Sequence, residues 1–247
     1  MLRLLVASSL CLATAIAIPS APVEAGQTRY SLFEEKGQAV ASTWTATNRF
    51  SALTLASGDS LTVQRGERWQ IRANGSPAVL ADLRFLVDDG EIVIGRRNLR
   101  GKHQSGTARI TVTAPSLTGV TLAGSGDLAV EQLTGAAASV TLAGSGTLRI
   151  VHLQVDHLTS KIAGSGKLTV AGHAEDTRLA IAGSGDLSGE HLTVGDAKIT
   201  IAGSGDARLH ATGAIESTIV GSGNVYVTGT NDCSLTRKGS GRLICFN

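Results

Sequence analysis

One position of a repeated motif holds most of the residues that could carry chemistry, and it directly follows each copy of Gly-Ser-Gly. The residues at this position are Asp127, Thr147, Lys167, Asp186, Asp206, Asn224 and Arg242. If successive copies stack, Asp186 and Asp206 lie on neighbouring layers, where two carboxylates suit acid–base chemistry on a sugar or a cation site. Asp and Asn are also common turn residues, whose side chains accept hydrogen bonds from nearby backbone amides. Because Lys167 and Arg242 interrupt the acids, as on a solvated edge, we expect this column to be structural.

A second candidate is the basic segment of residues 95–106, GRRNLRGKHQSG. It gathers Arg96, Arg97, Arg100, Lys102 and His103 in one predicted loop. Cationic side chains of this kind bind phosphate and carboxylate, so the loop could contact phosphate or uronate groups on envelope glycans. A solvated loop between two strands is the alternative interpretation, and the composition favours it.

The histidines and serines form no recognisable catalytic or metal-binding motif. The histidines are His103, His152, His157, His173, His191 and His210, and none shows HxH or HExxH spacing. The pattern GxSxG does not occur, and the serines of the Gly-Ser-Gly copies have no neighbouring histidine to activate them. We therefore expect no catalytic residue, no metal and no cofactor, and predict that the protein is not an enzyme.

The spacing of the motif predicts the elements that position these residues. The first glycines of its copies are Gly124, Gly144, Gly164, Gly183, Gly203, Gly221 and Gly239, at intervals of 20, 20, 19, 20, 18 and 18 residues. A fixed period in this range is typical of a solenoid. Aliphatic residues stand two before and four after nearly all of these glycines and alternate with polar residues, as in β-strands. The sequence therefore predicts an all-β, single-chain parallel β-solenoid (β-helix) with about 18–20 residues per coil.

Each predicted coil has two short strands flanking a glycine corner, plus a variable return arm. The corner requires glycine because a sharp turn uses positive φ angles that a side chain penalises. Upstream, LTLASGDSLTV (residues 53–63) keeps four aliphatic residues in the register of Val120, Leu122, Leu128 and Val130. We therefore predict an N-terminal arm or cap at residues 26–47, irregular β coils at 48–118 and the regular solenoid at 119–247.

The N-terminus has the pattern of a secretory signal over residues 1–25, with Arg3, an apolar run and a small-residue cleavage site at Val23-Glu24-Ala25. The run is shorter than the roughly 20 apolar residues of a membrane span, so we expect no transmembrane segment in the mature chain. Removing the signal takes away Arg3 and Glu24 together, so the formal net charge stays at +2. This lacks the basic excess typical of nucleic-acid binding. We predict an exported protein, either periplasmic or at the cell surface or secreted, with no nucleic-acid partner.

Two cysteines, Cys233 and Cys245, remain after the signal and its Cys11 are removed. They lie six residues before and six after Gly239, in the inward register of Leu235 and Leu243. Disulfides persist in exported proteins. We therefore predict a Cys233–Cys245 disulfide across the last coil.

The pattern as a whole resembles a bacterial family of unknown function described as putative auto-transporter adhesin, head GIN domain. The similar segments are residues 48–67, the strand pair around VDDGEIVI, residues 110–128 and the Gly-Ser-Gly corners, so the resemblance covers residues 48–245. It implies an exported, right-handed parallel β-solenoid. The sequence departs from self-displayed adhesins because no large translocator segment follows Asn247.

These observations predict an exported, non-catalytic β-solenoid that serves as a structural or adhesive module at the bacterial cell envelope. Its expected partners are an envelope glycan or a protein. The alternative is a polysaccharide-binding or polysaccharide-active β-helix protein, which fold alone does not exclude. That alternative needs at least two carboxylates and a base clustered on one face, and the sequence shows only the column after the corners.

Overall fold

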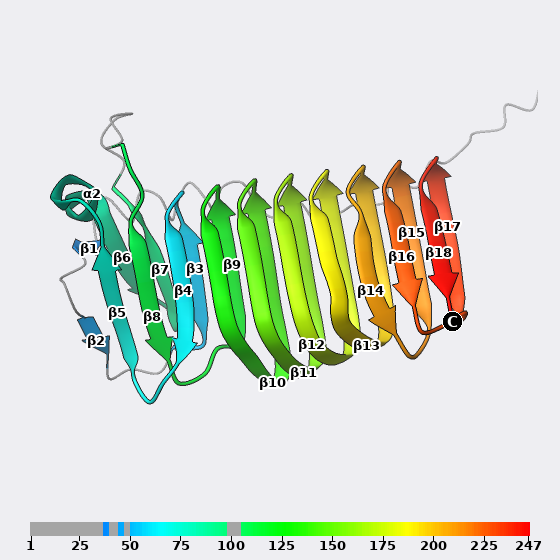
Figure 1. Cartoon of the computed structure of the whole chain (residues 1–247), viewed down its shortest axis with the longest axis horizontal. Coiled ribbons are helices and arrows are strands. Elements are labelled where there is room, and N and C mark those ends of the chain that lie inside the picture. The colour runs from blue at the N-terminus through cyan, green and yellow to red at the C-terminus, as the bar shows by residue number, and fades with distance from the viewer. Residues whose placement is uncertain (1–36, 40–43, 47–49, 98–104) are drawn as a thin grey trace, which may run out of the picture.

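The described chain folds as a flattened parallel β-solenoid, which confirms the predicted fold (Figure 1). The computed structural model describes residues 37–39, 44–46, 50–97 and 105–247, so the predicted signal peptide lies outside the described residues. Four long strands form its middle, each running from one Gly-Ser-Gly corner to the next. They are β10 (Asp127–Gly144), β11 (Thr147–Gly164), β12 (Lys167–Gly183) and β13 (Asp186–Gly203).

Each long strand bends at the lower edge of Figure 1 and so contributes to two facing sheets. We call them the post-corner sheet, formed by the half of each coil that follows a corner, and the pre-corner sheet, formed by the half that precedes the next one. The sequence predicted a separate return arm, but the ladder between β10 and β11 continues through the bend, from Asp127↔Thr147 to Gly144↔Gly164. Because similar neighbours bend together, the ladder hydrogen bonds are kept and no loop is needed.

The C-terminal coils are shorter, and in them the strands of the two sheets are separate. β14 (Ala207–Ala211), β16 (Asn224–Thr228) and β18 (Arg242–Phe246) extend the post-corner sheet. β15 (Ile215–Gly221) and β17 (Cys233–Gly239) extend the pre-corner sheet. Turns at residues 212–214 and 229–232 replace the bend.

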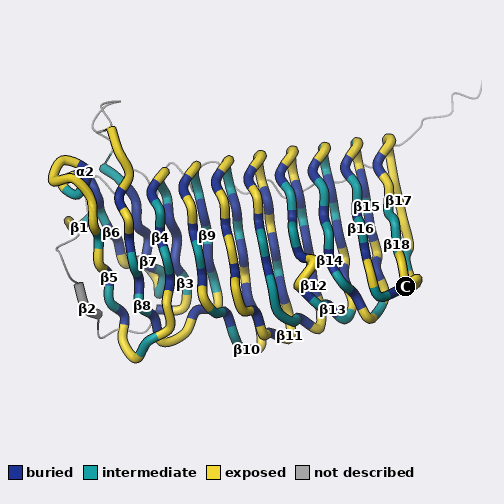
Figure 2. Tube along the Cα trace, viewed as in Figure 1, coloured by how far each residue is buried: buried dark blue, intermediate teal, exposed yellow. Residues whose placement is uncertain are grey.

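The core consists of aliphatic columns between the two sheets, visible as the alternation of buried and exposed positions in Figure 2. The residues four positions after the first six corner glycines are at most 2% exposed: Leu128, Leu148, Leu168, Leu187, Ala207 and Val225. Burying a leucine side chain stabilises a fold by about 1.5–3 kcal/mol. Since every coil adds similar residues, the core grows by stacking.

The corners stack through their backbones. All seven corner glycines have positive φ angles, from 115° at Gly183 to 150° at Gly124. Ser165 and Gly166 both donate backbone hydrogen bonds of 3.0 Å to the carbonyl oxygen of Gly144. A Cβ atom on Gly164 would collide with that same oxygen. The corner therefore needs glycine both for its φ angle and for the approach of the next coil.

The N-terminal half contributes a coil that stacks directly on the regular array. Its strands are β3 (Ala52–Ala56) and β4 (Ser60–Arg65), and they pair with β9 (Gly119–Gly124) and the start of β10. Leu53 lies opposite Val120, and Leu61 lies opposite Leu128. The register predicted for residues 53–63 is thus confirmed.

The order of coils in space differs from their order in the chain. β7 (Glu91–Arg96) and β8 (Arg109–Ala114) follow β3 and β4 in sequence but pair with their other side, away from β9. The chain therefore builds outward to this end and then returns across the first coil to begin the regular array.

Antiparallel strands and a helix close this end of the solenoid. β5 (Trp69–Asn74) pairs antiparallel with β8, and β6 (Leu83–Asp88) pairs antiparallel with β7. The helix α2 (Pro77–Asp82) joins them and is capped by the Ser76 hydroxyl, which accepts from the Val79 N–H. The short strands β1 (Gln38–Ala39) and β2 (Trp44–Ala46) add to β6 and β5 from within the predicted cap segment. In the described ranges, no helix is long and apolar enough to span a membrane.

Candidate functional site

The column that follows the corners is held by hydrogen bonds between coils. Asp186 Oδ1 accepts from the backbone N–H of Asp206 at 2.9 Å, and Asp206 Oδ1 accepts from the N–H of Asn224 at 2.8 Å. The Asn224 side-chain amide donates to the same Asp206 oxygen at 3.1 Å. These carboxylates therefore cap the first amide of the following coil, which is the ordinary role of a turn residue.

The basic segment is only partly described, and its first residue has a structural role. Arg96 pairs with Asp59, donating through Nε to Oδ2 at 2.9 Å and through its terminal nitrogen to Oδ1. That terminal nitrogen also donates to the carbonyl oxygen of Gly106 at 2.7 Å. Arg96 therefore has to be removed from the predicted anion-binding set, because its guanidinium is held by a buried carboxylate. Arg100, Lys102 and His103 lie outside the described residues, and Arg97 lies 3.6 Å from Asp82 Oδ1.

Asp59 occupies the corner of the first coil and is fully buried. Burial by itself raises the pKa of this carboxyl, but hydrogen bonds from Arg96, the Ala108 N–H and Ser57 together hold the pKa below its usual value. The Ala108 N–H donates to Oδ1 at 2.6 Å. The same pairing raises the pKa of Arg96 above its usual value. Asp59 thus ties the first coil to the loop before β8.

The described histidines lie singly on the surface. His157 contacts Asp176 at 3.1 Å, His173 contacts Glu175 at 3.1 Å, and His210 contacts the Thr228 hydroxyl at 3.0 Å. Within the described ranges, no three His, Cys, Asp or Glu side chains come together in a way that could hold a metal. The serines of the corners are exposed along one edge.

Cys233 and Cys245 form a disulfide that joins the two strands of the last coil. In the preceding coil, the equivalent positions hold Ile215 and Val227, which are at most 1% exposed. The disulfide thus replaces an apolar contact across the core and fixes β17 against β18.

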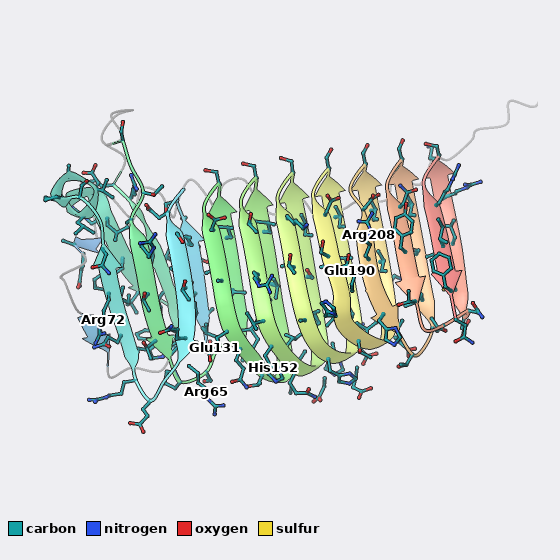
Figure 3. The ribbon with its side chains drawn as sticks, viewed as in Figure 1. Arg65, Arg72, Glu131, His152, Glu190 and Arg208 are labelled. Atoms are coloured by element: carbon teal, nitrogen blue, oxygen red, sulfur yellow. A yellow bond between two sulfur atoms is a disulfide. The ribbon has the colours of Figure 1, made fainter. Side chains whose placement is uncertain are left out.

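Charged side chains are scattered over this side of the molecule, with Arg72 on β5 and Glu131, Glu190 and Arg208 on the post-corner sheet labelled in Figure 3. Arg208 stacks over the ring of Tyr226, with its guanidinium carbon 4.9 Å from the ring centroid. A cation over an aromatic ring is stabilising. Because Arg208 also lies 3.7 Å from Asp206, these side chains are engaged with one another along the stack.

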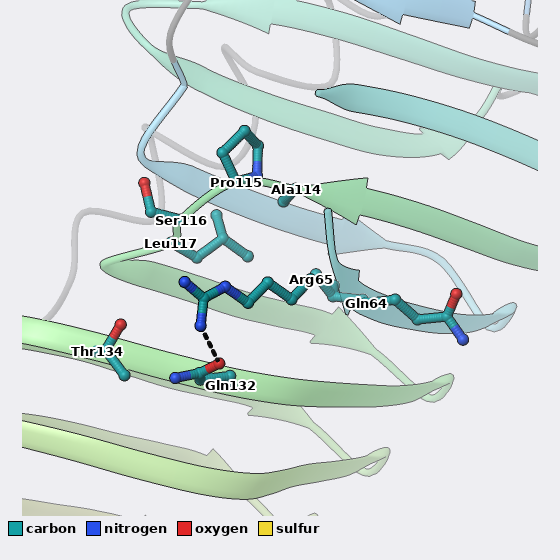
Figure 4. Close-up of a pocket in the computed structure, with 9 residues that line it drawn as sticks. Gln64, Arg65, Ala114, Pro115, Ser116, Leu117, Gln132 and Thr134 are labelled. Carbon is teal, nitrogen blue, oxygen red and sulfur yellow. Dashed lines mark hydrogen bonds between the residues drawn. The ribbon is translucent and has the colours of Figure 1, made fainter. Parts of the chain in front are cut away.

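A narrow cavity lies where the chain crosses from β8 to β9 (Figure 4). Its volume is about 20 Å³, and Pro115, Ser116 and Leu117 form part of its wall. Arg65 spans it and donates to Gln132 Oε1 at 3.3 Å. A cavity of this size accommodates about one water molecule, so it is too small for a ligand.

A larger groove lies along the pre-corner sheet next to the bend. Its volume is about 300 Å³, and it crosses β12, β13, β15 and β17. We call it the charged groove, and its charged residues are Asp176, Arg178, Asp196, Lys198, Glu216 and Asp232. Its volume lies at the lower end of the range for small-molecule and cofactor sites. It is located where the coil interval changes from 20 to 18 residues.

Two ladders of outward side chains form its walls. Asp176 pairs in register with Asp196 along one ladder. Arg178, Lys198 and Glu216 follow one another in register along the second. Between the ladders, Thr177, Ala197 and Ile215 are buried. Three coil spacings make the groove about 14 Å long, at about 4.8 Å each.

The charges in the groove remain open to solvent even where they have partners. Lys198 Nζ lies 3.0 and 3.1 Å from the two carboxylate oxygens of Glu216, and Asp196 Oδ1 accepts from the Ala214 N–H at 2.7 Å. The side chains of Asp176, Lys198 and Glu216 are 53–59% exposed. Such groups can exchange hydrogen bonds with the hydroxyl groups of a ligand along the groove, and water has free access to them.

The charged groove was not predicted, although the sequence contains a signal for it. Asp-Thr-Arg at residues 176–178 returns as Asp-Ala-Lys at residues 196–198, one coil later. Only the register of β12 on β13 places the two triplets side by side. The charged groove gathers several carboxylates on one face of the solenoid. The column after the corners does not.

Comparison with known proteins identifies relatives of this chain. The family described as "Putative auto-transporter adhesin, head GIN domain" matches residues 49–231. A putative adhesin from Bacteroides fragilis superposes with a TM-score of 0.73 at 21% identity, covering 84% of this chain and 99% of that one. A putative lipid binding protein from Parabacteroides distasonis gives a TM-score of 0.61 at 20% identity, with 82% and 95% covered. A putative adhesin from Parabacteroides merdae gives 0.60 at 20% identity, with 83% and 95% covered. No curated protein shows a significant sequence match.

Proposed function

This chain belongs to the family described as putative auto-transporter adhesin, head GIN domain, and on that premise we propose that it is an exported, non-catalytic adhesive module of the bacterial cell envelope. We further propose that it binds a glycan chain along the charged groove. The solved structures that it resembles support the fold, and the family description supports a binding role.

Two features support export. Residues 1–25 have the pattern of a secretory signal. The Cys233–Cys245 disulfide requires a compartment in which such bonds form and persist. The periplasm and the outer surface of the cell both meet this requirement.

The observation that carries the glycan proposal is the pairing of two polar ladders along the coil axis. A glycan is a chain of similar units, and the groove repeats one acidic and one basic side chain on the neighbouring strands β12 and β13. Carboxylates accept hydrogen bonds from sugar hydroxyls, and Arg178 and Lys198 donate to sugar oxygens. A linear polymer can therefore contact equivalent groups on these two coils, which gives avidity from weak individual contacts.

The geometry favours binding over turnover. Glycoside hydrolysis needs one carboxylic acid kept protonated and one positioned carboxylate. In the charged groove, Asp176 contacts His157, Asp196 accepts from a backbone amide and Glu216 pairs with Lys198. Since these side chains are open to water, no pair is isolated in the way that acid–base catalysis requires.

A glycan-array screen with the exported chain tests this proposal. We expect binding to one class of linear glycan, and we expect the double variant Asp176→Ala/Lys198→Ala to lose at least about tenfold in affinity, equivalent to about 1.4 kcal/mol. The matched control is Asp127→Ala/Arg149→Ala, which also removes one acidic and one basic side chain but from the post-corner sheet. Equal loss in both variants, or binding that neither variant changes, would place the ligand elsewhere.

A further inference from the structure

The two ends of the solenoid differ in how their strand edges are covered. At the N-terminal end, β5 and β6 pair antiparallel with the last parallel strands, and β1 and β2 add to them (Figure 1). At the other end, β17 pairs with β15 and β18 pairs with β16. Among the described residues, the strand pairings give β17 and β18 one partner each, on the inner side, and none on the outer side. Unpaired edges of this kind readily add further strands.

The last coil exposes inward side chains whose counterparts in the preceding coil are buried, and it also carries apolar side chains in outward columns. Leu235 is 37% exposed, whereas Ser217, its register partner in the preceding coil, is 0% exposed. Leu243 is half-buried, although its register partner Val225 is buried. Ile244 and Phe246 lie in the outward columns of Tyr226 and Thr228, and Phe246 is 52% exposed. Arg237 lies on the same inward side of β17 as Leu235, since its register partner Ile219 is buried, and Lys238 and Arg242 lie on the two sides of the corner. The uncovered end of the solenoid therefore presents apolar side chains together with cationic ones.

We propose that this edge is the docking surface for a second copy of the same chain, joined tail to tail. A single partner strand would cover only one of the two edges. The last coil of a second copy presents two edges at the same separation, which the Cys233–Cys245 disulfide fixes in both copies. Head-to-tail stacking is blocked because the other end is closed, so a two-fold contact ends the assembly at a dimer.

Charge selects how the two copies are oriented. Asp232 precedes β17 at its start, and Lys238 lies at the opposite end of that strand. When β17 pairs antiparallel with β17 of the second copy, each Lys238 approaches the Asp232 end of its counterpart. The other two-fold arrangement pairs β17 of one copy with β18 of the other. It brings Lys238 of one copy against Arg242 of the other, and this repulsion between two cations is unfavourable. The interface therefore places Thr236, at the middle of β17, close to Thr236 of the second copy.

Sedimentation of the exported chain at several concentrations tests the assembly. We expect a dimer at micromolar concentrations, and a monomer for Leu235→Lys under the same conditions. Because Leu235 is already partly exposed, this variant should keep its thermal midpoint within a few degrees of the parent. A monomeric parent chain at every concentration, or a dimer that persists in folded Leu235→Lys, would overturn the proposal.

Cysteine cross-linking tests the predicted geometry independently. Antiparallel neighbours place opposite Cα atoms about 4.5–5.5 Å apart, which is within reach of a disulfide. Thr236→Cys should therefore give a covalent dimer under mild oxidation. Thr200→Cys is the matched control, because Thr200, Thr218 and Thr236 share one outward column and Thr200 lies on an interior coil. Cross-linking at Thr200 as fast as at Thr236 would also overturn the proposal.

Discussion

Asp186 accepts a hydrogen bond from the backbone N–H of Asp206 at 2.9 Å, so the carboxylate of one coil caps the first amide of the next. Asp206 repeats this contact with Asn224. In the sequence, two acidic residues in a column resemble a catalytic pair. In the structure, each carboxylate accepts a hydrogen bond from the backbone of the following coil. Their role is to hold the coils in register, so the carboxylates available to a ligand are those of the charged groove on the opposite sheet.

The corner glycines should be intolerant of side chains. We expect Gly164→Val to lower the free energy of unfolding by about 2–4 kcal/mol, because valine is strained at a φ of 119° and its Cβ collides with the Gly144 carbonyl oxygen. Ser165→Val, one residue later at an exposed tip, is the control and should cost far less. Thermal unfolding of the two variants checks this, and an unchanged midpoint for Gly164→Val would contradict the stacked corner.

The disulfide should contribute to stability as well as shape. We expect Cys233→Ser with Cys245→Ser to lose about 3 kcal/mol, because the bond closes a short loop in the unfolded chain. The two cysteines are separated by 12 residues in sequence. Denaturant unfolding of parent and variant measures the loss. Intact-mass analysis of exported protein should show no free thiol, and two free thiols would refute the bond.

The Asp59–Arg96 pair should make folding stability sensitive to acid. Hydrogen bonding holds the pKa of Asp59 below its usual value despite burial, so the unfolded chain takes up this proton first as pH falls. The contribution of the Asp59–Arg96 pair to the free energy of unfolding is complete above about pH 4, and it is lost as the pH falls through the pKa of Asp59 in the folded state. We expect Asp59→Asn to cost about 3–5 kcal/mol at pH 7, since it leaves Arg96 without its carboxylate. The deficit should shrink at pH 3.

Urea unfolding at the two pH values measures this difference. Asp89→Asn is the control, because Asp89 is exposed in a turn and its positive φ is compatible with asparagine. If Asp59→Asn and Asp89→Asn had the same small effect at pH 7, the proposed clamp at the first corner would be wrong.

The predictable features were those encoded by local repetition. Alternating aliphatic residues gave the strands, and the register of Leu53 with Val120 followed from the same pattern. The order of coils was not predictable, because nothing in β7 or β8 specifies which side of β3 and β4 they join. The pair of Asp59 with Arg96 was missed because its partners are 37 residues apart in sequence. The charged groove depends on lateral register and on the shortening of coils, which local composition does not report.

The last prediction concerns catalysis. The exported chain should show no hydrolase or lyase activity on acidic or neutral polysaccharides, even on a glycan that it binds. Asp186→Asn with Asp206→Asn should leave binding unchanged, because asparagine keeps the oxygen that accepts the backbone N–H of the next coil. Asp176→Asn with Asp196→Asn should weaken binding, since these carboxylates face the charged groove. Reducing-end and unsaturated-sugar assays on the three proteins check this. Turnover by the parent chain that disappears in either double variant would show that the solenoid is a polysaccharide-active enzyme.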